Sequence, residues 1–275
     1  MSESNTVIPG FAYRPGSEGN YVATVLTTGP WSPQHEHAGP PTALVCSVLE
    51  ATAAAHGLSH MARLTVNLLR PIPVADVQVQ VAEDYVGRNA GHFSAVAMAQ
   101  GKVVARFTAL FQREGDVELP DGLPGHPLPM PPKLPSESIP LRFPFTLGAV
   151  GYPDLVETRL AQGRFFQGPC AVWFRLRHPL IADQSPSPYQ RVAVAADSGN
   201  GISAILDFSK YQFVNSDLTI NLLRRPVGEW VCLDARTHVS SHGGGLSESA
   251  LFDEAGLIGR ATQSLAVSMR VQPSA

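Results

Sequence analysis

A seven-residue segment that occurs twice is the feature that most constrains how this chain can fold. Residues 64–70 read LTVNLLR and residues 218–224, which lie 154 positions later, read LTINLLR, so the copies differ only by Val for Ile. The same offset carries Arg106 onto Arg260, with no net insertion in between. A repeat of this kind indicates a duplicated structural unit. We therefore predict that the chain contains two copies of one domain, and that each copy is long enough to enclose its own core.

The first half has the pattern of a helix packed against an antiparallel sheet. Two short strands are expected within residues 6–28, and a helix should begin at Pro40 or Pro41, because proline is favoured in a first helical turn. Gly57 is placed to end this helix. Val and Gln alternate in residues 75–87, with the period of two that a sheet covered on one face requires. The predicted strands are 61–70, 75–87, 92–100 and 103–113.

The second half repeats this pattern. A strand at 170–176 precedes a helix at 188–198, which Ser187 can cap and which should stop near Gly199. The remaining strands are predicted at 212–224, 229–240, 245–253 and 257–269. We therefore expect an α+β chain with two antiparallel meander sheets, each wrapped around a long helix.

The segment between the halves has a different composition. Residues 114–162 include the run LPDGLPGHPLPMPPKLP, and such proline-rich sequence favours an extended linker without regular elements. A short helix around 153–161 is left open. We predict an N-terminal domain at 1–113, a linker at 114–162 and a C-terminal domain at 163–275.

Composition narrows the possible partners and the compartment. The net charge is −3 and only 16% of residues are charged, so no basic patch favours nucleic acid. Three widely spaced cysteines in apolar runs are typical of reduced thiols. The first residues lack the features of a signal peptide, and no apolar run approaches the length of a membrane span. We expect a cytoplasmic protein, and the low charge density favours an oligomer.

Two core positions are polar in the second half only. Strand alternation places Gln263 on the helix-facing side, where the first half has Ala109, and Ser216 on the same side, where the first half has Ala62. Burying an unpaired amide or hydroxyl costs about 1–3 kcal/mol, so these groups need partners or a purpose. Asp197, in the last turn of the second helix, is a candidate partner. The alternative is that Asp197 only caps the turn that follows and the other two satisfy each other.

A motif before the first helix points to a known family. Residues 37–41 read HAGPP, and Gly29-Pro30-Trp31 precede them. With the order of elements described above, these residues resemble the double hot-dog acyl-CoA thioesterases of the thioesterase II type, which carry GPW followed by QHGGPP and ALL. The resemblance covers both halves and leaves out the linker. It implies a double hot-dog fold and an enzyme that hydrolyses acyl-CoA.

The resemblance also implies a catalytic site. In that family an Asp at the end of the second helix, a Thr or Ser on the next strand and a Gln on the last strand hold and activate the hydrolytic water. The matching residues here are Asp197, Ser216 and Gln263. Thr219 is the rival hydroxyl, although strand alternation turns it to the other face. We expect His37 to orient or cap the helix N-terminus, and the backbone N–H of Gly39 to contribute to an oxyanion site.

Other reactive groups suggest no further chemistry. His35-Glu36-His37 lacks the HExxH spacing, and His238 and His242 complete no ligand set, so we predict neither a metal nor another cofactor. No GxSxG motif occurs, and Cys46 lies among apolar helix residues, as a core residue would. Several arginines could meet the phosphates of coenzyme A. They are Arg70, Arg88, Arg224 and Arg225, of which we assign none.

We predict hydrolysis of acyl-CoA to a free acid and coenzyme A by a homodimeric enzyme. Asp197 would accept a proton from a water that Ser216 and Gln263 orient toward the thioester. Two alternatives stay open. A non-catalytic acyl-CoA-binding protein is favoured if the three groups do not converge. An enoyl-CoA hydratase of the same fold would need a His shortly after the Asp, whereas SGNGIS follows Asp197. The sequence leaves undetermined both the acyl group and whether coenzyme A or a carrier protein bears it.

Overall fold

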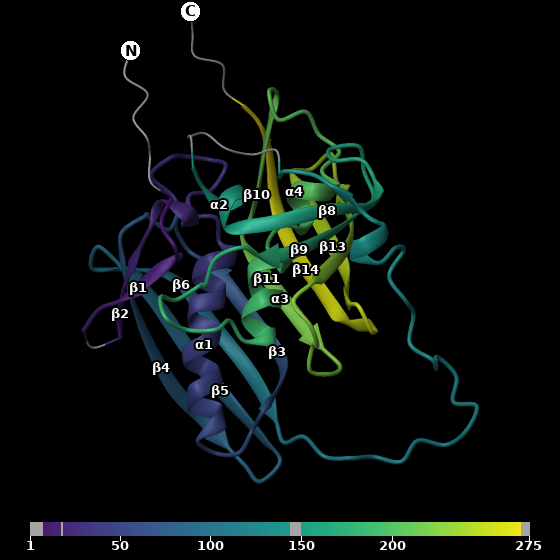
Figure 1. Ribbon diagram of the computed structural model, residues 1–275. Helices are drawn as coiled ribbons and strands as arrows, with labels where there is room; N and C mark the ends of the chain where they lie inside the picture. The colour runs from purple at the N-terminus through teal and green to yellow at the C-terminus, as the bar shows by residue number, and fades with distance from the viewer. Residues whose placement is uncertain (1–7, 18, 144–149, 271–275) are drawn as a thin grey trace, which may run out of the picture.

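One continuous antiparallel sheet runs through the computed structural model, which describes residues 8–17, 19–143 and 150–270 (Figure 1). Its 14 strands follow the order β1-β2-β4-β5-β6-β3-β11-β14-β13-β12-β9-β8-β7, and β10 pairs with β14 beside this path. The first six strands in this order precede the predicted linker in sequence and the others follow its start. The two predicted sheets are therefore joined edge to edge.

The first half forms the predicted meander around a single helix. Its elements are β1 Tyr13–Pro15, β2 Asn20–Ala23, the 3-10 turn Val25–Thr27, α1 Gly39–Ala54, β3 His60–Leu68, β4 Asp76–Val86, β5 Ala90–Ala99 and β6 Lys102–Gln112. Pro40 and Pro41 lie in the first turn of α1, as predicted. The helix lies across the strands of this half in Figure 1. None of the helices in the described ranges is long and apolar enough to cross a membrane.

The two halves meet at the repeated segment itself. Strand β3 pairs antiparallel with β11, and Thr65 lies directly opposite Thr219, the residue 154 positions later. Their Oγ1 atoms are 3.1 Å apart, within hydrogen-bond distance. Two equivalent residues that face each other in an antiparallel pair lie on a local two-fold axis. The duplication predicted from sequence is therefore seen as a pseudo-two-fold at the seam.

The second half departs from the prediction in its helix. Its elements are β9 Cys170–Leu176, α3 Pro188–Ala196, α4 Gly199–Ser203, β10 Tyr211–Asn215, β11 Asp217–Leu222, β12 Val231–Val239, β13 Gly244–Asp253 and β14 Gly256–Met269. A long helix was expected, but α3 has only nine residues. The helical region does not stop at Gly199 either. Helix α3 ends at Ala196, the chain turns at Asp197 and Ser198, and α4 follows. A side chain at Gly199 would place Cβ 2.7 Å from Ser249 Oγ, so any other residue here would displace that hydroxyl.

The predicted linker is only partly irregular. Residues 139–163 contain β7 Ile139–Pro140, α2 Tyr152–Leu155 and β8 Val156–Gly163, after the 3-10 turn Pro135–Glu137. Strand β8 pairs with β9 and extends the sheet of the second half. Val156 and Thr158 are buried while Glu157 and Arg159 are less so, which is the strand alternation that the proline-rich composition obscured. The short helix left open at 153–161 is α2 followed by this strand.

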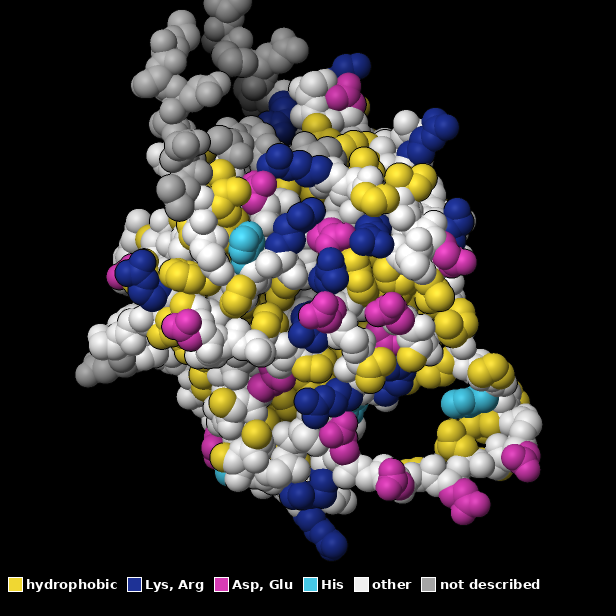
Figure 2. Space-filling model, viewed as in Figure 1, with side chains coloured by type: hydrophobic (Ala, Val, Ile, Leu, Met, Phe, Trp, Pro, Cys, Tyr) yellow, Lys and Arg dark blue, Asp and Glu magenta, His cyan; other side chains and the backbone are white. Residues whose placement is uncertain are grey.

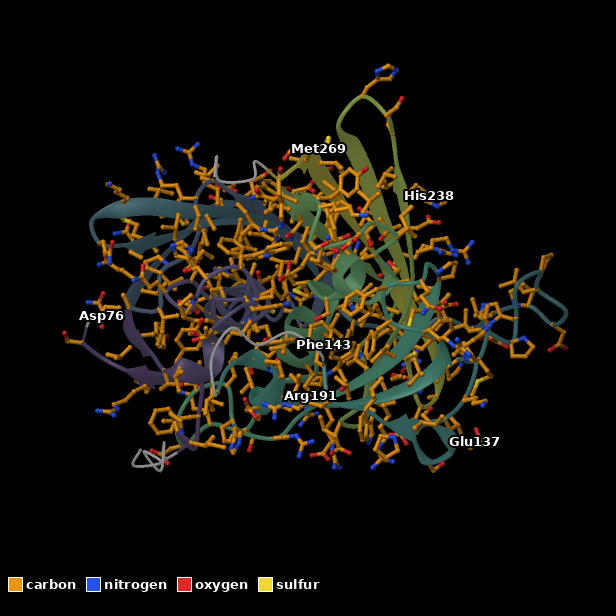
Figure 3. All side chains as sticks on the ribbon, turned by 90° about the horizontal axis from the view of Figure 1, so that it is seen from above. Asp76, Glu137, Phe143, Arg191, His238 and Met269 are labelled. Atoms are coloured by element: carbon orange, nitrogen blue, oxygen red, sulfur yellow. The ribbon has the colours of Figure 1, made fainter. Side chains whose placement is uncertain are left out.

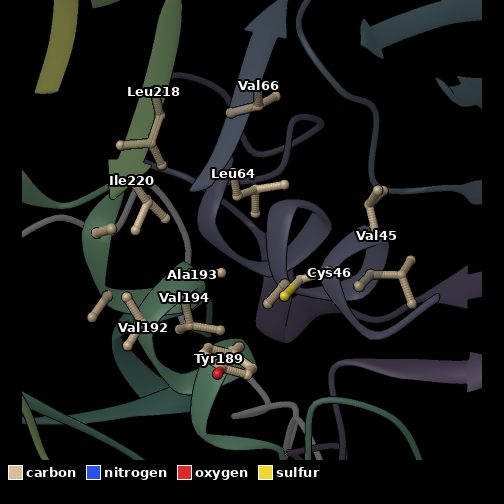
Figure 4. Packing of buried hydrophobic residues seen from close by; sticks show 14 of the residues in the cluster. Val45, Cys46, Leu64, Val66, Tyr189, Val192, Ala193, Val194, Leu218 and Ile220 are labelled. Carbon is tan, nitrogen blue, oxygen red and sulfur yellow. The ribbon is translucent and has the colours of Figure 1, made fainter. Parts of the chain in front are cut away.

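The helices of both halves share one hydrophobic core. Figure 4 shows side chains of α1, β3, α3 and β11 facing one another, including Cys46, Leu64, Val192 and Ile220. Each of these is at most 1% exposed. The three cysteines are free and buried, and Cys46 belongs to this core, as predicted. Since the core runs across the seam, α1 and α3 are held in contact, and each helix places its end beside the start of the other.

Candidate active site

The carboxylate of Asp197 lies at the C-terminal end of α3. This helix begins with a capping box, in which Ser187 Oγ accepts from Gln190 N and Gln190 Oε1 accepts from Ser187 N. Asp197 is the C-cap residue and is only 8% exposed. A helix C-terminus disfavours negative charge, so a buried carboxylate here requires hydrogen-bond donors.

Gln263 on β14 provides one of these donors. Its Nε2 lies 3.2 Å from Asp197 Oδ1 and 3.1 Å from the Asp197 carbonyl oxygen. At the other end of the amide, Oε1 accepts from the backbone N–H of Asn200, at 3.0 Å. The turn into α4 therefore fixes which end of the Gln263 amide faces Asp197. The structure places Gln263 facing the helix, as strand alternation predicted, and brings it to Asp197.

Asn215, and not Ser216, provides the second donor. Its Nδ2 lies 2.8 Å from Asp197 Oδ1, whereas Ser216 is exposed. Asn215 pairs with Leu265 and Thr219 pairs with Thr262, so four steps along β10 and β11 match only three along β14.

This extra residue is a β-bulge, which shifts the alternation of side chains by one position. The expectation that Ser216 faces the helix with the following strand is therefore wrong. Asn215 takes the inward position instead. The only feature of the sequence that could have indicated Asn215 is its type, because asparagine is disfavoured inside a strand. The rival hydroxyl of Thr219 bonds Thr65 at the seam and does not reach Asp197.

His37 reaches the same carboxylate from the first half. Its Nδ1 lies 3.1 Å from Asp197 Oδ2, and both side chains are almost fully buried. Burial lowers the pKa of His37, against the opposing effect of the Asp197 charge, so the ring is neutral at neutral pH. A neutral imidazole carries its proton on one ring nitrogen, and when that nitrogen is Nδ1 the ring donates a hydrogen bond to Oδ2.

Gly39 lies beside His37, and its backbone N–H points at the imidazole. The backbone N–H of Gly39 lies 3.1 Å from His37 Nδ1 and points to it. Nδ1 cannot accept this bond and donate to Asp197 at the same time, so the Gly39 N–H is free for an oxyanion when Nδ1 donates to Asp197, and its role stays a prediction. A side chain at Gly39 would place Cβ 2.5 Å from the Val194 carbonyl oxygen, so glycine is required where α1 crosses α3. Of the HAGPP motif, His37 is thus the residue that contacts Asp197.

Tyr152 supports the imidazole from the segment predicted as linker. Its ring stacks on His37 with centroids 3.8 Å apart and planes 1° from parallel. Its hydroxyl donates to the Val194 carbonyl oxygen and lies 2.9 Å from Ser198 Oγ. Burial raises the pKa of Tyr152, so the phenol stays protonated. No pattern in the sequence pointed to this residue, because a stacking contact between distant segments appears only in the folded chain.

The equivalent row of paired residues in the first half has no buried polar side chain. Across β12, β13 and β14, Thr237 pairs with Ser247 and Ser247 pairs with Gln263. Across β4, β5 and β6, the positions 154 residues earlier are Glu83, Phe93 and Ala109, paired in the same way. Phe93 and Ala109 are buried, so the first half has no buried amide at this row. The structure therefore has the polar row only where Asp197 is.

Histidines and cysteines form no second constellation. His238 is exposed on β12 (Figure 3), and no group of three or more His, Cys, Asp or Glu suited to a metal is found among the residues described above. Burial raises the pKa of Cys46, which keeps this thiol protonated and unreactive.

Two family models match the sequence. Residues 27–112 match the acyl-CoA thioesterase N-terminal domain, and residues 120–267 match the acyl-CoA thioesterase C-terminal domain. Comparison with curated protein sequences finds no match.

Solved structures share the architecture. One is a conserved protein with a hot-dog fold from Alicyclobacillus acidocaldarius, at 19% identity and a TM-score of 0.68, covering 94% of this chain and 96% of that one. Another is an acyl-CoA thioesterase II from Mycobacterium marinum, at 17% identity and a TM-score of 0.62, covering 93% and 94%. At such identities the likeness establishes the fold, which is the hot-dog fold in both halves.

Proposed function

The chain belongs to the acyl-CoA thioesterase family and hydrolyses acyl-CoA thioesters to a free acid and coenzyme A, and we propose that Asp197 is the general base of this reaction. The supporting observation is the convergence of His37, Asn215 and Gln263 on this one buried carboxylate. An ionised carboxylate has about four acceptor sites. Three are used here, which leaves one for a water.

The reaction balances with these groups alone. Asp197 takes a proton from the water while the water oxygen adds to the thioester carbonyl carbon. The carbon–sulfur bond then breaks, and the thiolate of coenzyme A takes up the proton that Asp197 holds. General-base catalysis of this kind contributes typically about 10²–10⁴-fold to the rate. The non-catalytic alternative was favoured if Asp197, Ser216 and Gln263 did not converge. Ser216 stays apart, but Gln263 contacts Asp197 and Asn215 takes the place of Ser216, which counts against that alternative.

The amides of Gln263 and Asn215 orient the base. Both donate to Oδ1, so they hold the plane of the carboxylate. Oδ2 faces His37 and the N-terminus of α1. The positive end of that helix favours negative charge nearby, which suits an oxyanion forming on the thioester.

His37 is the competing candidate for the base, because its Nδ1 contact with Asp197 is also the arrangement of an imidazole oriented by a carboxylate. The variants His37→Asn and Asp197→Asn separate the two assignments. Thiol release from acyl-CoA should fall much further in Asp197→Asn if the carboxylate is the base. If His37→Asn loses as much activity as Asp197→Asn or more, the imidazole is the base and Asp197 orients it.

We further propose that the enzyme is a cytoplasmic homodimer. Leu69 and Leu223 are equivalent positions of the two copies, and both are about half exposed, at 47% and 49%. Together with the low charge density they offer apolar surface near the seam. Light scattering should give twice the chain mass at micromolar concentration, and a monomer would contradict the proposal. The three free thiols suit a reducing compartment, which cell fractionation would test.

A further inference from the structure

We propose that a cleft lined by Arg177 and Arg191 binds the phosphates of coenzyme A. The inference rests on the thioesterase function above and identifies where the nucleotide end of the substrate docks. The cleft has a volume of about 410 Å³, within the range of small-molecule sites. It lies between the end of β9, the segment leading to α3, and α3 itself.

The charged side chains of the cleft differ in how far they are already neutralised. Those that line it are Arg175, Arg177, His178, Asp183, Arg191 and Glu229. Arg175 is paired with Glu157 at 2.6 Å and with Glu229 at 3.6 Å. The acidic Glu229 is therefore compensated by Arg175, and Asp183 is the remaining acid. Figure 2 shows Lys and Arg side chains interleaved with Asp and Glu through the middle of one face of the molecule.

Arg177 and Arg191 are held in place by backbone carbonyls. Arg177 Nε donates to the Val156 carbonyl oxygen at 3.2 Å, and Arg191 Nη1 donates to the Gly228 carbonyl oxygen at 2.8 Å. Arg191, labelled in Figure 3, comes from α3. A guanidinium has five N–H donors, so one carbonyl contact fixes the group and leaves donors for a phosphate. The two arginines thus form a pre-oriented pair of phosphate ligands.

Another arginine considered from sequence is less suited. Arg224 donates to both carboxylate oxygens of Asp253, each at 2.6 Å, and Asp253 is fully buried. This guanidinium neutralises a buried charge, so withdrawing it to bind phosphate would leave that charge unpaired at high cost.

The cleft is close enough to the catalytic carboxylate for one substrate to span both. Arg191 lies in the first turn and a half of α3 and Asp197 caps its C-terminus, six residues later or about 9 Å along the helix axis. Arg177 N donates to the Leu155 carbonyl oxygen at the end of α2, the helix whose Tyr152 stacks on His37. In coenzyme A the extended pantetheine arm separates the phosphates from the thiol. This arm would bridge the cleft and Asp197.

The test compares a substrate with the nucleotide and one without it. The double variant R177Q/R191Q should raise KM for acyl-CoA by about 10- to 100-fold, the worth of one or two lost charge-assisted hydrogen bonds. Its kcat should stay within about twofold of the parent, since the catalytic side chains are untouched. With the same acyl group on N-acetylcysteamine, which lacks phosphates, kcat/KM should equal that of the parent. The variant R236Q is the matched control, because Arg236 lies away from the cleft and pairs with Glu248.

Calorimetric binding of free coenzyme A makes the test independent of hydrolysis. The double variant should bind it more weakly than the parent and R236Q should not, while Asp183→Asn should tighten binding by removing a like charge from the phosphates. Equal affinity and equal KM in the parent and the double variant would overturn the proposal. If the parent binds coenzyme A through the two arginines yet hydrolyses no thioester, the catalytic assignment is wrong while the assignment of the cleft as the phosphate site is supported.

Discussion

The imidazole of His37 and the carboxylate of Asp197 are 3.1 Å apart, although they belong to different halves of the chain. Helices α1 and α3 run side by side, so the start of one meets the end of the other. The pseudo-two-fold repeats this relationship: Glu50 on α1 contacts Ser187 Oγ before α3, at 2.6 Å. Glu50 comes nine residues after Pro41, as Asp197 comes nine residues after Pro188. Each half therefore holds a carboxylate against the opposite helix, and the two differ in their surroundings.

We expect only the Asp197 carboxylate to be catalytic. Glu50 contacts Cys46, and the first half has Ala109 at the position equivalent to Gln263. Among the described residues, therefore, no side-chain amide is found bonded to Glu50. Glu50→Gln keeps an acceptor for Ser187 and should change kcat by less than about twofold. Steady-state thiol release from acyl-CoA measures this. A large loss without a change in thermal stability would mean that a second catalytic carboxylate exists.

Asn215 and Ser216 provide a test of the β-bulge. Asn215→Ala removes a donor to Asp197 Oδ1 and should lower kcat by about tenfold, the worth of roughly one hydrogen bond to a charged group. Ser216→Ala should have a smaller effect, because this side chain is exposed and outside the constellation. The reverse order of the two effects, measured on the same acyl-CoA, would restore Ser216 as the residue that orients the water.

Stability should decrease with rising pH because of Glu36. This buried side chain accepts from the Tyr13 hydroxyl, and burial raises its pKa to about 8 from an ordinary value of 4.5. The folded state therefore binds more protons than the unfolded state between these pH values. The free energy of unfolding should fall by up to about 1.4 kcal/mol for each pH unit across this window.

The variant Glu36→Gln isolates this effect, because the amide cannot titrate. Urea unfolding at pH 5, 6, 7 and 8 should show a shallower decline for the variant than for the parent. Parallel curves would mean that Glu36 is ionised in the folded state across the whole range.

The sequence predicted the parts of the site that depend on local rules. Gln263 follows from strand alternation, and Asp197 follows from the end of a helix that Ser187 and Pro188 begin. The prediction for Ser216 was wrong because a single extra residue in the strand reverses which side chains face the helix. No local sequence pattern marks where such a bulge will fall. Tyr152 could not be predicted at all, since it lies in a proline-rich segment and its role depends on stacking against a distant side chain.

The fold was predictable for a related reason. A duplicated segment with a constant offset means that both halves have the same order of strands. The structure adds that the two copies pair with each other, with Thr65 opposite Thr219. Local propensity could not show that the second helix breaks after Ala196. The chain turns at Asp197 and Ser198, and Gly199 then begins α4 instead of ending a helix.

Hydrolysis by Asp197→Asn is the most direct measurement of the central claim. This substitution keeps the shape of the side chain and removes its ability to accept a proton. We predict that kcat for acyl-CoA falls by about 10²–10⁴-fold, while the affinity for coenzyme A and the thermal midpoint stay close to those of the parent. If Asp197→Asn hydrolyses acyl-CoA as fast as the parent, Asp197 is not the base, and the buried carboxylate is only a contact at the end of a helix.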